Sequence, residues 1–134
     1  MEKKKLMIIT ILSVIILVVL VLTIRYISKD FVTKNSGEIT IVLVDIDGNE
    51  VKSKEIKFNE NDTLVSLITN NFNNVKIENG MLMSIESFET PQDFSTFISI
   101  YVDDKMSDVG LKDIKFKDQT KISFIMTKNN YVNN

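Results

Sequence analysis

The stretch ITIVLVDIDGNEVKSKEIKFNENDTLVSLITNNF, residues 39–72, decides the fold of this chain. Its first run, residues 39–45, is β-branched and nearly all apolar, which is typical of a central strand. A turn sequence follows at 46–49, where Gly48 is free to take a positive φ, and residues 51–58 then alternate as a more exposed partner strand. The first half of the stretch therefore predicts an opening β-hairpin.

The second half of the stretch predicts a short helix. Either Asp62 or Thr63 suits its N-terminal cap. Behind the cap, apolar residues recur at helical spacing: Leu64, Leu67, Ile68 and Phe72. A stripe of this kind is the ordinary way for a helix to cover a sheet, and we prefer that interpretation to a ligand groove.

Three more strand patterns follow the helix. Residues 81–85 come after an Asn-Gly turn, whereas 97–102 and 121–127 each place alternate apolar side chains on one face. The polar segment 86–96 contains the single proline of the chain and is predicted to be a loop. Hairpin, helix and further strands in this order predict an α+β domain over 38–128, with a β-grasp-like mixed sheet and one short helix packed on one face.

Upstream of this domain, a basic N-terminus (1–5) precedes the run LMIITILSVIILVVLVLTI at 6–24, which has no charge, glycine or proline. As a helix the run would span about 28 Å, close to the roughly 30 Å hydrocarbon core of a membrane. The alternative, a cleaved signal peptide, would end in an Ala-x-Ala-like site that this run lacks. We expect an uncleaved transmembrane signal anchor, a juxtamembrane linker at 25–37 and a frayed tail at 129–134.

Charge gives the expected orientation and excludes some partners. Three lysines lie within residues 1–5 and three basic residues within 25–34, so the short-range count is tied. Because the first three are packed together, we expect the N-terminus in the cytoplasm and the C-terminal domain outside the cell, at the cell membrane. Residues 37–134 hold ten lysines, no arginine and sixteen acidic residues, a net charge of −6, which disfavours nucleic acid and anionic headgroups as partners.

The segment FISIYVDDKMSDVGLKDIKFKDQTKISFIMT, residues 97–127, resembles the end of a transcobalamin-type C-terminal domain, a family also called domain of unknown function 4430. In that family an apolar strand ends in a Val-Asn-Gly-Lys-like turn, a glycine-containing link leads to a second turn, and a Lys-Ile-x-Phe strand closes the domain. Residues 102–105 and 116–120 stand at the two turns, and the resemblance extends over 38–128. Asp104 stands where the family has a glycine, and Gln119 and Thr120 stand where it has Gly-Asp, so we expect both turns to be looser.

The resemblance implies a small extracytoplasmic module of bacterial surface proteins, here a single-pass, membrane-anchored member. It implies no cofactor. Transcobalamin-like proteins enclose cobalamin between this domain and a large helical domain, and no helical domain of that kind is expected in this chain, so cobalamin is not carried over.

Chemistry-bearing residues are few. Asp103, Asp104 and Asp108 lie close in sequence, and a turn between strands explains them better than a weak cation site or a catalytic one. The segment 45–50 begins like an EF-hand loop but lacks its later glycine and glutamate, so a hairpin turn is preferred. The sequence has no histidine or cysteine to act as a base, nucleophile or metal ligand, and we expect no enzymatic activity.

Two non-enzymatic functions stay open. The first is a binding module for an envelope protein or extracellular ligand, which would use the loop 86–96 and four candidate contact residues: Phe97, Tyr101, Asp103 and Asp104. The competing interpretation of Phe97 and Tyr101 is that the helix or neighbouring loops cover them. The second function is an accessory or structural subunit of a membrane complex, held through the helix at 6–24.

Overall fold

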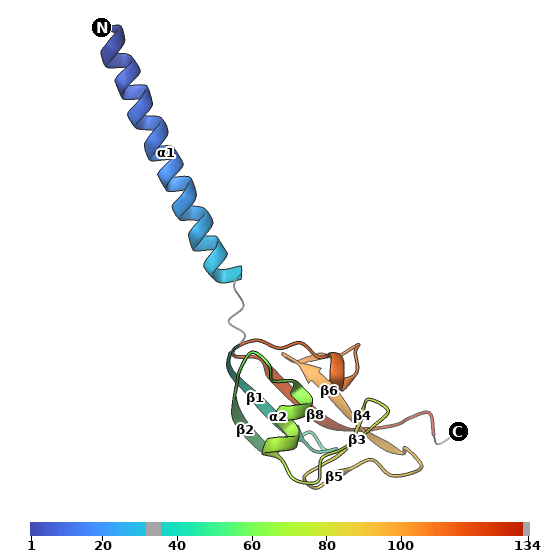
Figure 1. Cartoon of the computed structure of the whole chain (residues 1–134). Coiled ribbons are helices and arrows are strands. Elements are labelled where there is room, and N and C mark those ends of the chain that lie inside the picture. Colours follow the sequence, from blue (N-terminus) through green and yellow to red (C-terminus); the bar gives the residue numbers. More distant parts are fainter. Residues whose placement is uncertain (32–35, 133–134) are drawn as a thin grey trace. The chain divides into compact units, whose positions relative to one another are not determined.

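The computed structural model describes residues 1–31 and 36–132, and the chain divides into an N-terminal helix and a C-terminal α+β domain (Figure 1). The first helix, α1, runs from Glu2 to Phe31. It therefore continues through 25–31, which was expected to be linker, because nothing in that segment breaks a helix. Of the rest of the expected linker, residues 32–35 lie outside the described residues, and Gly37 already begins the first strand, β1 (Gly37–Val44).

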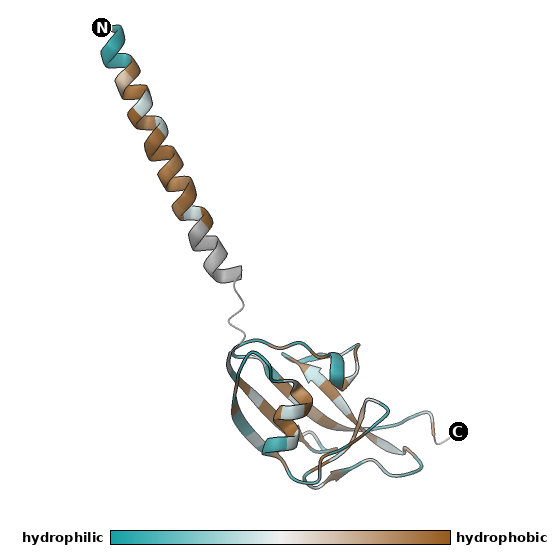
Figure 2. Cartoon of the chain, in the orientation of Figure 1, coloured by the Kyte–Doolittle hydropathy of each residue, from teal (hydrophilic) through white to brown (hydrophobic). Residues whose placement is uncertain are grey.

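The helix α1 is long and apolar enough to cross a membrane over Glu2–Ile24. Every side chain from residue 6 to 24 is exposed, and this apolar length follows a polar N-terminal end (Figure 2). The hydroxyls within it are satisfied locally, since Thr10 donates to the Leu6 carbonyl at 2.8 Å and Thr23 to the Val19 carbonyl at 2.7 Å. The helix therefore carries no unpaired hydroxyl in its apolar run.

The domain is built on a mixed five-stranded sheet in the order β2-β1-β8-β6-β7. The first and last long strands lie side by side and parallel, and the other neighbours are antiparallel, which is the β-grasp arrangement predicted from the sequence. The strands of this sheet are β1 (Gly37–Val44), β2 (Glu50–Phe58), β6 (Thr96–Val102), β7 (Lys105–Met106) and β8 (Lys121–Lys128).

The helix α2 (Leu64–Asn71) covers one face of this sheet, as predicted (Figure 1). Thr63 caps its N-terminus in a capping box, in which the Ser66 N–H donates to the Thr63 hydroxyl at 3.1 Å and the Thr63 N–H to the Ser66 hydroxyl at 3.0 Å. The predicted helix stripe is buried, and it packs against alternate residues of the central strands: Ile39, Ile41, Leu43, Ile98, Ile122 and Phe124.

Residues 81–85 form a strand, but the expectation of a single sheet is wrong for them. They form β4 (Met81–Ile85) of a second sheet, ordered β3-β4-β5, with β3 (Lys76–Glu78) and β5 (Phe88–Glu89) as its edges. Tight turns with positive φ at Asn79, Gly80 and Glu86 fold this segment back on itself, so it pairs locally. The predicted loop 86–96 therefore contains a short strand.

Two further features lie in segments predicted as connections. A single 3-10 turn, η1 (Leu111–Asp113), buries Leu111 against the core between β7 and β8. At the C-terminus the Asn129 N–H donates to the Ser95 carbonyl at 2.9 Å, and Tyr131 is almost fully exposed. The remainder of the predicted tail, residues 133–134, lies outside the described residues.

Candidate functional site

A groove beside the second sheet is the strongest candidate site in the described part of the chain. It consists of two adjoining hollows of about 360 and 350 Å³ that share Lys76, Ser84 and Glu89 as lining residues. The first hollow extends toward Glu86, and the second toward the residues that follow β5: Thr90, Gln92 and Phe94. Both volumes reach the size of small-molecule sites in proteins, about 300–1,000 Å³.

Several polar groups of the groove have hydrogen-bonding capacity to spare. The Thr90 side chain lines the second hollow, is only 7% exposed, and its hydroxyl has no hydrogen-bond partner. Glu89 and Gln92 form no side-chain hydrogen bond or ion pair with any residue from 1–31 or 36–132. A buried hydroxyl without a partner costs about 1–3 kcal/mol, so Thr90 is an unusual group to find in this position.

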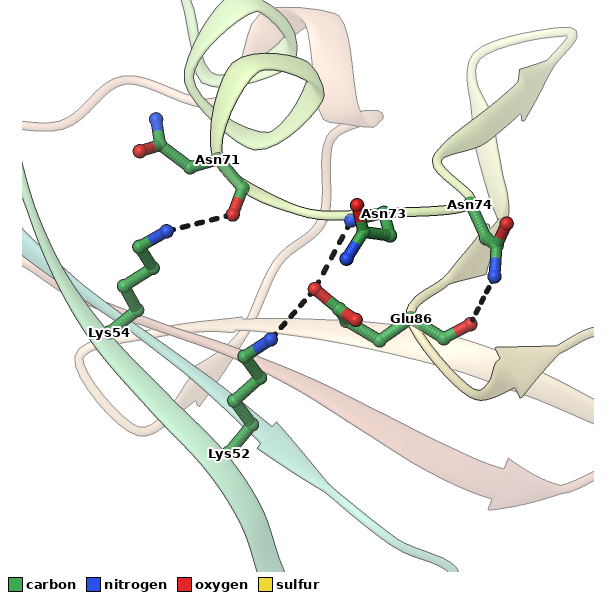
Figure 3. A network of polar contacts seen from close by, with 6 residues as sticks. All are labelled: Lys52, Lys54, Asn71, Asn73, Asn74 and Glu86. Carbon is green, nitrogen blue, oxygen red and sulfur yellow. Dashed lines mark hydrogen bonds and ion pairs between the residues drawn. The ribbon is translucent and has the colours of Figure 1, made fainter.

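Glu86 holds the groove to the rest of the domain (Figure 3). Its carboxylate accepts a hydrogen bond from Lys52 Nζ of β2 at 2.8 Å and another from the Asn73 N–H at 3.1 Å, while the Asn74 side chain donates to its carbonyl. The Lys52 ammonium and the Asn73 N–H together hold the pKa of Glu86 below its ordinary value. The Glu86 carboxylate therefore stays ionised, and its hydrogen bonds serve to hold the domain together.

The end of α2 is fixed beside this junction. Lys54 Nζ of β2 donates to the Asn71 carbonyl in the last turn of the helix at 2.9 Å (Figure 3). The ammonium groups of Lys52 and Lys54 also lie 5.6 and 5.7 Å from the ring centroid of Phe72. One wall of the groove is thus joined to both the main sheet and the helix.

The aromatic residues predicted for partner binding lie away from this groove. Ile98, Ile100 and Val102 of β6 face the core, so Phe97 and Tyr101 project from the opposite face of the main sheet, where both are half-exposed. The helix α2 does not cover them, because the apolar phase of β6 points the other set of residues toward the helix. Both are partly buried, so cover by neighbouring segments stays an open interpretation.

Asp103 and Asp104 form the turn of a tight hairpin, as preferred from the sequence. Val102 pairs with Lys105, so these two residues are its whole loop, with φ values of 47° and 66°. The Asp103 carboxylate accepts from the Lys121 N–H at 2.9 Å, and Asp104 pairs with Lys121 Nζ at 3.1 Å. The hairpin loop has only two residues and both adopt the left-handed conformation, so the loosening expected at Asp104 is not seen.

The other acidic positions also have structural roles or stand alone. The Asp45 carboxylate accepts from the Asn49 N–H at 2.8 Å, which holds the pKa of Asp45 below its ordinary value, and Gly48 takes the positive φ of this hairpin loop. Asp108 is exposed. Within 1–31 and 36–132, no group of three or more His, Cys, Asp or Glu side chains is placed to hold a metal ion.

The sequence reasoning indicated part of the groove but not its centre. The loop 86–96 was expected to contribute to binding, and it does supply one wall. The sequence reasoning missed Thr90, Lys76 and Ser84, because isolated hydroxyls and a lysine in a polar segment show no regular spacing that would indicate a site. Only Pro91 indicated that the segment is an ordered loop.

Comparison with known proteins assigns the chain to a family. The family model described as domain of unknown function (DUF4430) matches residues 61–128, half of the chain. The chain belongs to the DUF4430 family. The matched part contains α2, the whole groove and strands β3 to β8. The transcobalamin link inferred from the sequence is not tested by this match and stays a prediction.

A solved structure shares the fold of the DUF4430 domain. It comes from Ruminococcus gnavus ATCC 29149, is provisionally described as a metal binding protein, and superposes with a TM-score of 0.53 at 8% identity. The superposition covers 69% of this chain and 98% of that one. At this identity the likeness concerns the fold alone. A comparison with functionally curated proteins finds no match.

Proposed function

We propose that this DUF4430 chain is a membrane-anchored, extracytoplasmic, non-enzymatic binding module whose ligand site is the groove beside the second sheet. The observation that carries the proposal is the Thr90 hydroxyl, buried and without a partner at a hollow of binding-site size. Because this oxygen is itself not solvent-accessible, a ligand hydroxyl or amide would bond to it only after the Thr90 side chain rotates toward the hollow, and the bond would then relieve an existing cost.

The anchor is the apolar part of α1. Its exposed aliphatic side chains need a nonpolar surrounding, and a membrane supplies one along the whole run from residue 6 to 24. The lysines ahead of it favour an N-terminus held in the cytoplasm, with the domain outside the cell.

Binding suits the groove better than catalysis. Acid–base chemistry by a carboxylate pair needs one member that can carry a proton near neutral pH. The carboxylate pair of the groove is Glu86 and Glu89. Lys52 and Asn73 hold Glu86 in its ionised form, so it is a poor general acid, and only the Glu89 carboxylate is unpaired. The full sequence supplies no histidine or cysteine to take over that part.

We do not extend metal binding from the Ruminococcus gnavus structure to this chain. Metal ions such as Ca²⁺ take six to eight oxygen ligands in proteins, several of them carboxylates. The groove offers one unpaired carboxylate, that of Glu89, because Glu78 pairs with Lys76 at 3.0 Å and Glu86 pairs with Lys52.

A fragment screen tests the proposed site without assuming its ligand. The full chain, ¹⁵N-labelled and held in lipid nanodiscs, would be titrated with small alcohols, amides, amines and carboxylates at millimolar concentration. We expect the largest amide shifts from hydroxyl and amide fragments, clustered in residues 74–94. Shifts confined to the face that carries Phe97 and Tyr101 would move the site there. An absence of shifts would favour the alternative of an accessory subunit that acts through α1.

A further inference from the structure

We infer that the groove binds a short neutral saccharide, one or two sugar rings long. The inference rests on the proposed function and adds the chemical class of the ligand. It combines three properties of the groove: its charge, its free hydrogen-bonding groups and an aromatic ring exposed at its rim.

The charge of the groove disfavours anions. Its lysine, Lys76, is neutralised by Glu78 at 3.0 Å, and Glu86 is paired with Lys52. The unpaired charge that remains is the Glu89 carboxylate, which lines both hollows. Together with the net charge of −6 on residues 37–134, this potential repels phosphates, sulfates and uronic acids and accepts neutral ligands.

The free hydrogen-bonding groups suit a polyol. A sugar presents adjacent hydroxyls, each of which donates and accepts, so it pairs with mixed partners at short spacing. The groove offers the exposed carboxylate of Glu89 and the exposed amide of Gln92. The unpartnered hydroxyl of Thr90 joins them once its side chain rotates toward the hollow. A purely apolar ligand would leave these groups unsatisfied.

Phe94 supplies an apolar surface for the C–H face of a sugar ring. It lines the second hollow and is 41% exposed, although an isolated phenylalanine gains nothing from contact with water. Its φ of 52° is costly for a bulky residue. The Pro91 carbonyl, which accepts from the Phe94 N–H at 3.0 Å, helps to hold the turn in this conformation.

The test uses the full chain in lipid nanodiscs, because maltoside and glucoside detergents would compete for the groove. Maltose, cellobiose and diacetylchitobiose are the neutral probes, and glucuronic acid is the acidic control; binding is followed by amide shifts and calorimetry. We expect at least one neutral disaccharide to shift residues 74–94 and to bind about tenfold or more tightly than glucuronic acid.

Three variants sharpen the assignment. Thr90→Val is isosteric and should weaken binding about tenfold, the loss of one hydrogen bond, while the thermal midpoint stays equal or rises because an unsatisfied hydroxyl is removed. Phe94→Ala should weaken binding by a similar factor. Glu89→Gln should bring glucuronic acid closer to the neutral probes. Tyr101→Ala, on the opposite face of the main sheet, is the matched control and should leave binding unchanged.

Failure of the inference is distinguishable from failure of the proposed function. If hydroxyl or amide fragments bind the groove but none of the neutral saccharides shifts it, the saccharide class is wrong and the site stands. If neither fragments nor saccharides shift residues 74–94, both are wrong. Saccharide binding that Thr90→Val and Phe94→Ala leave intact would also overturn the assignment.

Discussion

Asp104 shows why a single residue misled the sequence prediction. An aspartate in place of a glycine was expected to loosen the hairpin turn, yet Asp104 adopts a φ of 66°. Aspartate tolerates the left-handed region better than most residues, because its short polar side chain bonds to groups nearby. Here the partner is Lys121 Nζ, which lies 3.1 Å from the Asp104 carboxylate.

Two substitutions at this position separate backbone strain from the lost ion pair. Asp104→Gly and Asp104→Ala both remove the pair with Lys121, but only glycine accepts a positive φ without cost. We therefore expect Asp104→Gly to unfold with a free energy about 1 kcal/mol higher than Asp104→Ala. Urea denaturation of both variants measures the difference, and equal midpoints would show that the turn is not held in the left-handed conformation.

The contacts of Glu86 predict that the stability of the domain depends on pH. Folding lowers the pKa of Glu86, so its ionised form stabilises the domain at pH values above the ordinary pKa of a glutamate. This contribution to stability is lost as the pH falls through the folded-state pKa. Glu86→Gln should lower the free energy of unfolding by about 1 kcal/mol at pH 7, since part of the network is exposed. The difference from wild type should shrink below pH 4.5.

The matched control for that prediction is Glu78→Gln. Glu78 also pairs with a lysine, but both partners are largely exposed, so its removal should change stability by less than about 0.5 kcal/mol. Urea denaturation at pH 7 and pH 3 measures both variants. A Glu86→Gln effect that is the same at both pH values would contradict a role for the ionised carboxylate.

At the level of elements, long periodic segments were predictable and short ones were not. The strands β1, β2, β6 and β8 and the helix α2 each carry an apolar period over at least seven residues, and the sequence predicts all of them. The strands β3, β5 and β7 have two or three residues, too few to show a period. Their pairing depends on turns at residues such as Asn79 and Glu86, whose positive φ no spacing rule anticipates.

The helix α2 offers the sharpest test of the core. Leu67 is 5% exposed and faces the main sheet, so Leu67→Asp places an unpaired charge in the core and should abolish the thermal transition of the domain. Asn70→Asp adds the same charge on the exposed side of the helix and should shift the midpoint by only a few degrees. Near-ultraviolet circular dichroism of Tyr101 follows the transition of the domain, in a Tyr26→Phe background because Tyr26 lies in α1. Similar midpoints for the two variants would show that Leu67 is not in the core.

At the scale of the whole molecule, the sequence predicts the apolar N-terminal helix and the fold of the domain, but not the candidate site. The apolar run at 6–24 and the α+β order of the domain follow from composition and periodicity. The candidate site does not, because it is formed where β4 and β5 pair locally and bring Ser84, Glu89 and Thr90 to one groove. That pairing is a property of the folded segment and leaves no motif in the sequence.

The central proposal is a binding domain held outside the cell by α1. Protease accessibility of a C-terminal tag on intact, wall-stripped cells tests it most directly, with a cytoplasmic protein as the control. We expect the tag to be digested while the cytoplasmic control survives. Protection of the tag until the membrane is lysed would place the domain in the cytoplasm and contradict the proposed function.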